Sequence, residues 1–209
     1  MRALALAALA VVALARPAEL VFVRHAETQA NATGRYNSRT INTFSDLGEK
    51  QVVSLTQRLQ GRRFDAILVS PSERVLRTIA PYLRNNHLRA VVWPDLYECC
   101  DAHTRKVKDG GKLAYGAKIT IPGDLVGLFI IERAHDRLPA AASYDEGLRQ
   151  IRACADRLRQ DFGGTPKSVL VVGHSLMGGR LLELMQGKPM VGKIRPANTS
   201  ITSLHFGKH

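Results

Sequence analysis

The stretch Leu20–Asn31, LVFVRHAETQAN, decides the fold, because an uninterrupted apolar run leads directly into charged residues. Four consecutive apolar residues are typical of a strand that is buried on both faces of a parallel sheet. In open α/β sheets, ligands bind at the edge where the carboxyl ends of the strands meet. The stretch therefore predicts an α/β fold with a polar site that includes Arg24, His25 and Glu27.

Further apolar runs indicate strands, and the segments between them place apolar residues at helical spacing. The expected strands are 19–23, 65–70, 89–93, 168–173 and 201–206. The expected helices are 46–60, 72–83, 144–162 and 177–185. This alternation predicts an α/β domain with three layers, helix, sheet and helix, around a mostly parallel central sheet.

The composition is that of one globular domain with a large excess of positive charge. The chain has 209 residues, of which 45% are hydrophobic, and a formal net charge of +12. This charge favours anionic partners, such as phosphorylated small molecules, nucleic acids and acidic lipid surfaces. No nucleic-acid partner is expected, because only 6% of residues are aromatic and few of them accompany the basic ones. A basic surface that serves solubility alone is the alternative.

Residues 1–15 have the pattern of a secretory signal peptide. Arg2 supplies a positive start, residues 3–15 are uncharged, and Ala13-Leu14-Ala15 has the small residues of a cleavage site. An apolar stretch of this length is too short to span a bilayer, so no stable membrane anchor is expected after cleavage. We expect export to the periplasm or the exterior, and one domain over 16–209. The alternative is a cytoplasmic protein whose N-terminal helix packs on the domain.

The three cysteines have no spacing that is typical of a metal site. They are Cys99, Cys100 and Cys154, and no CxxC pair is present. A structural zinc ion is therefore not expected. One of the adjacent pair could form a disulfide with Cys154, and three buried free thiols are the alternative.

Five segments of the chain resemble, in the correct order, the histidine phosphatase superfamily, which contains phosphoglycerate mutases and phytases. RHAET at 24–28 is similar to the RHG signature of this family. The other segments are FSDLGEKQ at 44–51, VSPSERVLRT at 69–78, LYE at 96–98 and VVGHS at 171–175. The resemblance implies a phosphoglycerate mutase-like fold and phosphoryl-transfer chemistry that needs no metal ion and no cofactor.

The resemblance also implies a role for each matching residue. His25 would attack phosphorus and become a phosphohistidine, and Glu98 would exchange protons with the leaving alcohol and with water. The phosphoryl oxygens would be bound by three side chains: Arg24, Arg74 and His174. Neutral substrate contacts would come from three others: Thr28, Asn31 and Ser175.

Several positions depart from the family pattern. Ala26 replaces the usual glycine, and Ser175 follows the second histidine where glycine is frequent. Ser72 and Arg77 replace a common leucine and glutamine, and Arg180 lies one residue later than in the mutases. These departures favour a histidine-type acid phosphatase, a metal-independent phosphomonoesterase, over a mutase. Mutase-type phosphoryl transfer and a catalytically inactive phosphate-binding protein are the alternatives.

A basic segment over residues 101–123 is expected to form a lid that selects the substrate. It contains five basic residues: Arg105, Lys106, Lys108, Lys112 and Lys118. Their charge suggests a small substrate with further anionic groups, whereas a solvated loop without a role is the alternative.

The stretch VLVVGHSLMGGRLL also resembles the nucleophile elbow of α/β-hydrolases, with Ser175 as the nucleophile. However, Met177 stands where the G-x-S-x-G pattern needs its last glycine. The triad partners should also follow the serine, and Glu183 is the only carboxylate side chain after it. The sequence therefore does not favour an α/β-hydrolase.

Overall fold

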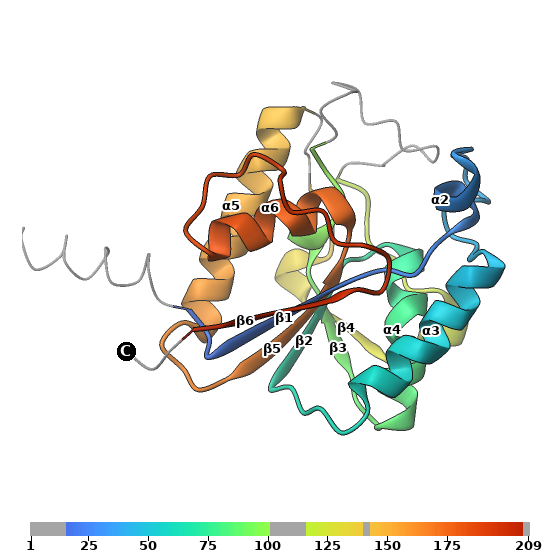
Figure 1. Ribbon diagram of the computed structural model, residues 1–209, viewed down its shortest axis with the longest axis horizontal. Coiled ribbons are helices and arrows are strands. Elements are labelled where there is room, and N and C mark those ends of the chain that lie inside the picture. Colours follow the sequence, from blue (N-terminus) through green and yellow to red (C-terminus); the bar gives the residue numbers. More distant parts are fainter. Residues whose placement is uncertain (1–15, 101–115, 140–142, 207–209) are drawn as a thin grey trace, which may run out of the picture.

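A computed structural model of the chain describes residues 16–100, 116–139 and 143–206. Its centre is a six-stranded sheet with the strand order β4-β3-β2-β5-β1-β6. Helices α5 and α6 cover one face of this sheet, and α3 and α4 cover the other (Figure 1). The predicted three-layer α/β architecture is confirmed. Residues 1–15 and most of the basic segment 101–123 lie outside the described residues.

The sheet is parallel except at one edge. Its strands are β1 (Glu19–Arg24), β2 (Ala66–Val69), β3 (Ala90–Val92), β4 (Phe129–Ile131), β5 (Ser168–Gly173) and β6 (Ile201–His205). β6 runs antiparallel to β1. In the parallel pair of β1 and β5, Arg24 lies opposite Gly173. This register brings the two residues that follow these strands, His25 and His174, to the same point of the sheet edge.

The expected helices are all present, and two of them begin at a capping serine. The α-helices are α2 (Gln29–Thr33), α3 (Asp46–Leu59), α4 (Glu73–Asn85), α5 (Tyr144–Phe162) and α6 (Ser175–Met185). Three short 3₁₀ turns are η1 (Pro94–Leu96), η2 (Gly123–Leu125) and η3 (Arg133–His135). The side chains of Thr28, Ser45 and Ser143 cap α2, α3 and α5, which satisfies amides that have no partner inside the helix. Helix α2 and strand β4 were not predicted, because each is too short for a periodic pattern.

Strand β1 explains why its apolar run shows no polar alternation. Val21 and Val23 join the hydrophobic cluster beneath α4, whereas Leu20 and Phe22 join the cluster beneath α5 and α6. Both faces of the strand are thus fully buried. Each such side chain contributes about 1.5–3 kcal/mol to folding.

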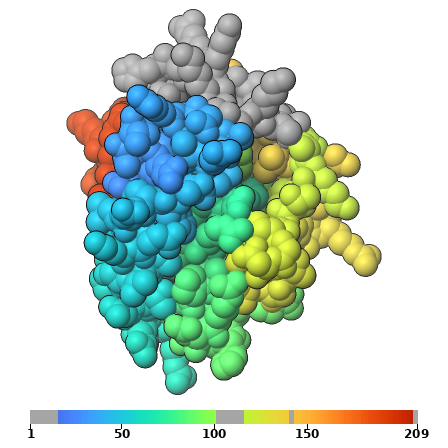
Figure 2. All heavy atoms as spheres, turned by 90° about the vertical axis from the view of Figure 1, so that its right-hand side faces the viewer, coloured from blue at the N-terminus to red at the C-terminus, as the bar shows by residue number. Residues whose placement is uncertain are grey.

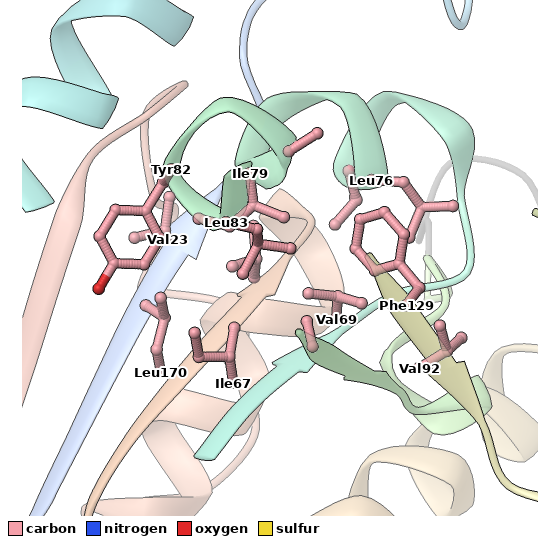
Figure 3. Packing of buried hydrophobic residues seen from close by; sticks show 14 of the residues in the cluster. Val23, Ile67, Val69, Leu76, Ile79, Tyr82, Leu83, Val92, Phe129 and Leu170 are labelled. Atoms are coloured by element: carbon pink, nitrogen blue, oxygen red, sulfur yellow. The ribbon is translucent and has the colours of Figure 1, made fainter. Parts of the chain in front are cut away.

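Helix α4 packs on the sheet through one apolar face. Four of its side chains, Leu76, Ile79, Tyr82 and Leu83, point toward the strands and lie over buried residues of β2 and β5 (Figure 3). All four are at most 1% exposed. This packing fixes the start of α4 above the carboxyl end of β2, where Arg74 lies.

The described part of the segment that follows the gap, residues 116–139, covers the flank of α4. In Figure 2 it forms the yellow surface beside α4, which is green. Asp124 pairs with Arg77 at 2.8 Å, and its carbonyl oxygen accepts a hydrogen bond from Arg84. Leu125 and Phe129 complete the cluster beneath the helix.

The three cysteines are free and buried, so the predicted alternative of free thiols is confirmed and no disulfide to Cys154 forms. The Sγ atoms of Cys99 and Cys100 are 2.8 Å apart.

Among the described residues, no helix is both long and apolar enough to cross a membrane.

Candidate active site

His25 lies directly after β1, and its hydrogen bonds decide which of its two ring nitrogens carries the proton. Its backbone N–H continues the sheet by donating to the Gly173 carbonyl at 3.0 Å. Its Nδ1 is 2.7 Å from the Ala26 carbonyl oxygen. A carbonyl oxygen only accepts hydrogen bonds, so Nδ1 carries the proton and the neutral ring keeps a lone pair on Nε2.

Burial, together with the nearby positive charge of Arg74 and Arg24, lowers the pKa of His25 well below its usual value. The ring is therefore neutral at physiological pH. A neutral imidazole with a free Nε2 is a competent nucleophile.

His174 lies directly after β5 and contacts His25 edge to face, with 5.3 Å between the ring centroids. Its Nδ1 is 3.4 Å from a guanidinium nitrogen of Arg74, and its Nε2 is 2.8 Å from the Ser70 hydroxyl. Because a guanidinium only donates, Nδ1 accepts and Nε2–H donates to Ser70. Burial and the charge of Arg74 lower the pKa of His174 well below its usual value.

Two arginines bring positive charge to this point. Arg74, in the first turn of α4, is 8% exposed. Arg24, the last residue of β1, donates to the Pro196 carbonyl at 3.1 Å, and its buried Nε has no hydrogen-bond partner among the described residues. Neither arginine has a carboxylate within 4.0 Å in the described part of the chain. Guanidinium groups without a carboxylate partner suit an anionic ligand.

Glu98, which follows η1, reaches the start of α6. Its carboxylate accepts backbone N–H groups of Met177 at 2.9 Å, Cys99 at 3.3 Å and Leu176 at 3.4 Å. The N-cap residue of α6 makes no side-chain cap bond, so Glu98 caps this helix from another segment.

The pKa of Glu98 is raised, because burial outweighs the N–H donor of Met177 and the charge of Arg74. Burial lowers the pKa of Arg24, and the negative charge of an ionised Glu98 opposes part of that decrease. The structure therefore brings together all five residues for which the sequence suggested catalytic roles. A carboxyl group with a raised pKa is suited to donate a proton.

The three residues for which neutral substrate contacts were expected make bonds within the protein. Thr28 and Asn31 cap α2 reciprocally, since each side-chain oxygen accepts the backbone N–H of the other residue at 3.2 Å. The Asn31 amide nitrogen is 3.5 Å from the Tyr36 hydroxyl. Ser175 donates to the Pro196 carbonyl at 3.3 Å. A direct contact of these residues with substrate stays a prediction.

Several residues that hold the site in place were not among the candidates. Thr78 accepts the Ala26 N–H at 3.0 Å, and Gln51 accepts the Glu27 N–H at 2.8 Å. Both lie in segments that resemble the family motifs, so their spacing was the available signal. Asn198 donates to the His25 carbonyl at 2.9 Å, and no sequence pattern pointed to it.

One glycine lets the segment after β1 pack closely on α3. A Cβ atom on Gly48 would lie 1.9 Å from the Glu27 carbonyl oxygen, so only glycine fits there.

Among the described residues, no cluster of three or more His, Cys, Asp or Glu side chains is arranged to hold a metal ion. The groups that do converge, two guanidiniums, a neutral imidazole and a protonatable carboxyl, suit the transfer of a phosphoryl group.

Sequence comparison gives a match over nearly the whole chain. Residues 20–209 match the family model of the histidine phosphatase superfamily (branch 1). The adenosylcobalamin/alpha-ribazole phosphatase of Escherichia coli (strain K12) is 34% identical over 79 residues, which are 38% of this chain and 39% of the relative. Phosphoserine phosphatase 1 of Hydrogenobacter thermophilus is 33% identical over 73 residues, or 35% of each chain. These two alignments thus span well under half of either relative.

Solved structures of similar fold include phosphatases and a mutase. The alpha-ribazole phosphatase from Shigella flexneri has a TM-score of 0.65 at 20% identity and covers 91% of both chains. A mycobacterial glucosyl-3-phosphoglycerate phosphatase has a TM-score of 0.60 at 20% identity, covering 89% of this chain and 90% of its own. Phosphoglycerate mutase from Bacillus anthracis has a TM-score of 0.59 at 19% identity, covering 94% and 91%. At such identities the similarity shows the fold alone.

Proposed function

Because this chain belongs to the histidine phosphatase superfamily, we propose that it hydrolyses a small phosphomonoester through a phosphohistidine on His25. The observation that carries the proposal is the state of His25. Its Nδ1 donates to a backbone carbonyl and its pKa is lowered, which leaves an uncharged nucleophilic Nε2 beside two guanidiniums. The relatives with local sequence similarity are named as phosphatases, which supports hydrolysis.

In the first step, the Nε2 lone pair of His25 attacks phosphorus and the bond from phosphorus to the leaving oxygen breaks. Burial raises the pKa of Glu98, which favours its acid form, and in that form Glu98 gives its proton to the leaving oxygen. Arg24 and Arg74 face the charge that spreads over the other phosphoryl oxygens. His174 lies beside His25 and would bind a phosphoryl oxygen by turning its Nε2–H from the Ser70 hydroxyl to the substrate. The products are a free alcohol, a phosphohistidine and an ionised Glu98.

In the second step, Glu98 as carboxylate removes a proton from water. The water oxygen attacks phosphorus and the bond from phosphorus to Nε2 breaks, which releases inorganic phosphate. His25 is again neutral and Glu98 is again protonated, so the cycle closes without a metal ion or an external cofactor. Fixed guanidinium groups provide the charge stabilisation throughout.

The substrate that we propose is small and carries anionic groups besides the reacting phosphate. The net charge of +12 and the five basic residues of the segment 101–123 support this class. Of that segment, only 116–123 is described, so its role as a lid rests on sequence alone.

We propose further that residues 1–15 are a cleaved export signal and that 16–209 form the mature domain. N-terminal sequencing of protein from the exported fraction would test the signal, and an intact Met1 there would refute it.

The proposed reaction is tested by hydrolysis of a chromogenic aryl phosphate, with and without a chelator. His25→Ala should abolish turnover, with a loss of at least about 10³-fold, and His174→Ala should reduce it strongly. His205→Ala is the matched control, because His205 is exposed on β6 and outside the site. Activity that survives His25→Ala, or that requires added metal, would refute the mechanism.

A further inference from the structure

The chain after α6 returns to the end of β1 and binds the backbone on both sides of the nucleophile. Thr199 N–H donates to the Arg24 carbonyl at 3.0 Å, and the Asn198 side chain donates to the His25 carbonyl at 2.9 Å. The Pro196 carbonyl accepts the Arg24 guanidinium. We propose that Asn198 is a positioning residue for His25, within a clamp formed by residues 196–199. This inference rests on the proposed function, in which His25 is the nucleophile.

The peptide unit between His25 and Ala26 is held from two directions. Asn198 donates to its carbonyl oxygen. The hydroxyl of Thr78, which belongs to α4, accepts its N–H at 3.0 Å. The imidazole Nδ1–H is bonded to the next carbonyl, that of Ala26. Rotation of the held peptide would therefore move the acceptor that orients the ring, and with it the lone pair on Nε2.

The clamp is bonded to helices α6 and α3 through neighbouring residues. Its own position is therefore fixed, and it can hold the backbone of His25 in one place. The Glu183 carboxylate of α6, which is 2% exposed, accepts the N–H groups of three successive residues: Gly192, Lys193 and Ile194. The Ile194 carbonyl packs so closely on α6 that a Cβ at Gly179 would lie 1.9 Å from it. At the other end, Arg58 of α3 donates to the Thr199 carbonyl at 2.7 Å.

The backbone conformation of Thr199 supports the proposal that residues 196–199 form a clamp. Its φ is +51°, in the left-handed region that threonine rarely adopts. This conformation coincides with the point where its N–H bonds Arg24 and its carbonyl accepts Arg58. A strained residue that is bonded on both sides of its backbone is typical of a segment that positions a functional group.

Loss of the Asn198 amide would release the nucleophile without removing any phosphate-binding group. The His25 carbonyl would lose its side-chain donor, and the peptide plane could rotate. A displacement of about 1 Å at a reacting atom costs about 10²-fold in rate. The contacts proposed to bind the phosphoryl group, from Arg24, Arg74 and His174, would remain. The expected effect is therefore on kcat rather than on KM.

The test compares Asn198→Ala and Asn198→Asp with wild type and with Asn86→Ala. Asn86 is the matched control, because its amide also donates to a backbone carbonyl, that of Tyr82 at 2.8 Å, but at the far end of α4. Asp has the size of Asn and lacks the donor when ionised, so it keeps the test informative if the alanine variant does not fold. The readouts are kcat and KM for a chromogenic aryl phosphate, the single-turnover rate of phenolate release, and Tm.

We expect both Asn198 variants to lose about 10- to 100-fold in kcat and in the single-turnover rate, with KM within about twofold and Tm close to that of Asn86→Ala. A kcat within about twofold of wild type would overturn the inference. An equal loss in Asn86→Ala, or a change in KM alone, would also overturn it. The proposed function fails separately, if His25→Ala keeps wild-type activity. An inactive His25→Ala together with fully active Asn198 variants refutes only the clamp.

Discussion

Replacing Glu98 with glutamine separates the helix cap that the structure shows from the proton transfer that we propose. The carboxylate accepts N–H groups from Met177, Cys99 and Leu176 at 2.9–3.4 Å. Glutamine keeps one accepting oxygen and places an NH₂ group against the remaining donors. Loss of a helix cap costs about 0.5–2 kcal/mol. Glutamine also avoids burying a charge, which offsets part of this cost, so we expect a decrease of about 1 kcal/mol in the free energy of unfolding.

The effect of Glu98→Gln on activity should depend on the leaving group. General acid catalysis contributes about 10²–10⁴-fold, so hydrolysis of an alkyl phosphate should decrease by that factor. An aryl phosphate with a stable phenolate needs no proton in the first step, and His25 should still be phosphorylated at a rate near that of wild type. Because the second step needs Glu98 as a base, we expect a burst of about one phenolate per enzyme, followed by slow turnover.

The assay is stopped-flow release of phenolate, together with steady-state hydrolysis of both substrates and denaturant unfolding. Asp95→Asn is the control, because Asp95 lies in the neighbouring turn η1 and burial also raises its pKa. It should leave the ratio of alkyl to aryl hydrolysis unchanged. Equal losses on both substrates without a burst would refute Glu98 as the proton donor. A selective loss in Asp95→Asn would assign the role to Asp95 instead.

Three further predictions concern pH, packing and substrate. For an alkyl phosphate, the value of kcat/KM should decrease as pH falls through the lowered pKa of His25, because the ring then gains a proton, and as pH rises through the raised pKa of Glu98, because the acid is then lost. The pH–rate profile should have its optimum on the acid side of neutrality, and an alkaline optimum would contradict this. Gly48→Ala should destabilise the protein by about 1–3 kcal/mol and lower kcat, because its methyl group would meet the Glu27 carbonyl. Gly123→Ala, where a Cβ meets nothing within 4 Å, is the control in denaturant unfolding, and equal effects would refute the reasoning. Neutralising the three lysines of the proposed lid, Lys106, Lys108 and Lys112, should raise KM more for multiply charged than for singly charged substrates, and unchanged relative KM values would refute the lid.

The sequence was sufficient for the layers of the fold because burial leaves a pattern: helical spacing in the helices and continuous apolar runs in the strands. The runs at 20–23 and 169–172 are apolar throughout, as strands covered on both faces must be, and both lie inside the sheet. The antiparallel direction of β6 could not be predicted, because a short apolar run does not encode its partner. Strand β4 has only three residues and one buried side chain, Phe129, so it lacks a pattern altogether.

The candidate site was predictable where chemistry and spacing coincide. Arg24 and His25 end an apolar strand, and His174 ends another, so their convergence follows from a parallel sheet. The cap role of Glu98 could not be predicted, because it joins segments that are 79 residues apart. The same holds for Asn198, whose bond to His25 spans 173 residues of sequence. A side chain that acts on a distant backbone group leaves no local pattern.

Direct isolation of the phosphoenzyme shows whether His25 is the nucleophile. Wild type and Glu98→Gln would be mixed with substrate, quenched in base to preserve the phosphorus–nitrogen bond, digested, and analysed by mass spectrometry. We expect one phosphoryl group on the peptide that contains His25, at higher occupancy in Glu98→Gln, where its hydrolysis is slowed. A phosphoryl group on another residue, or substrate turnover without any phosphorylated His25, would contradict it.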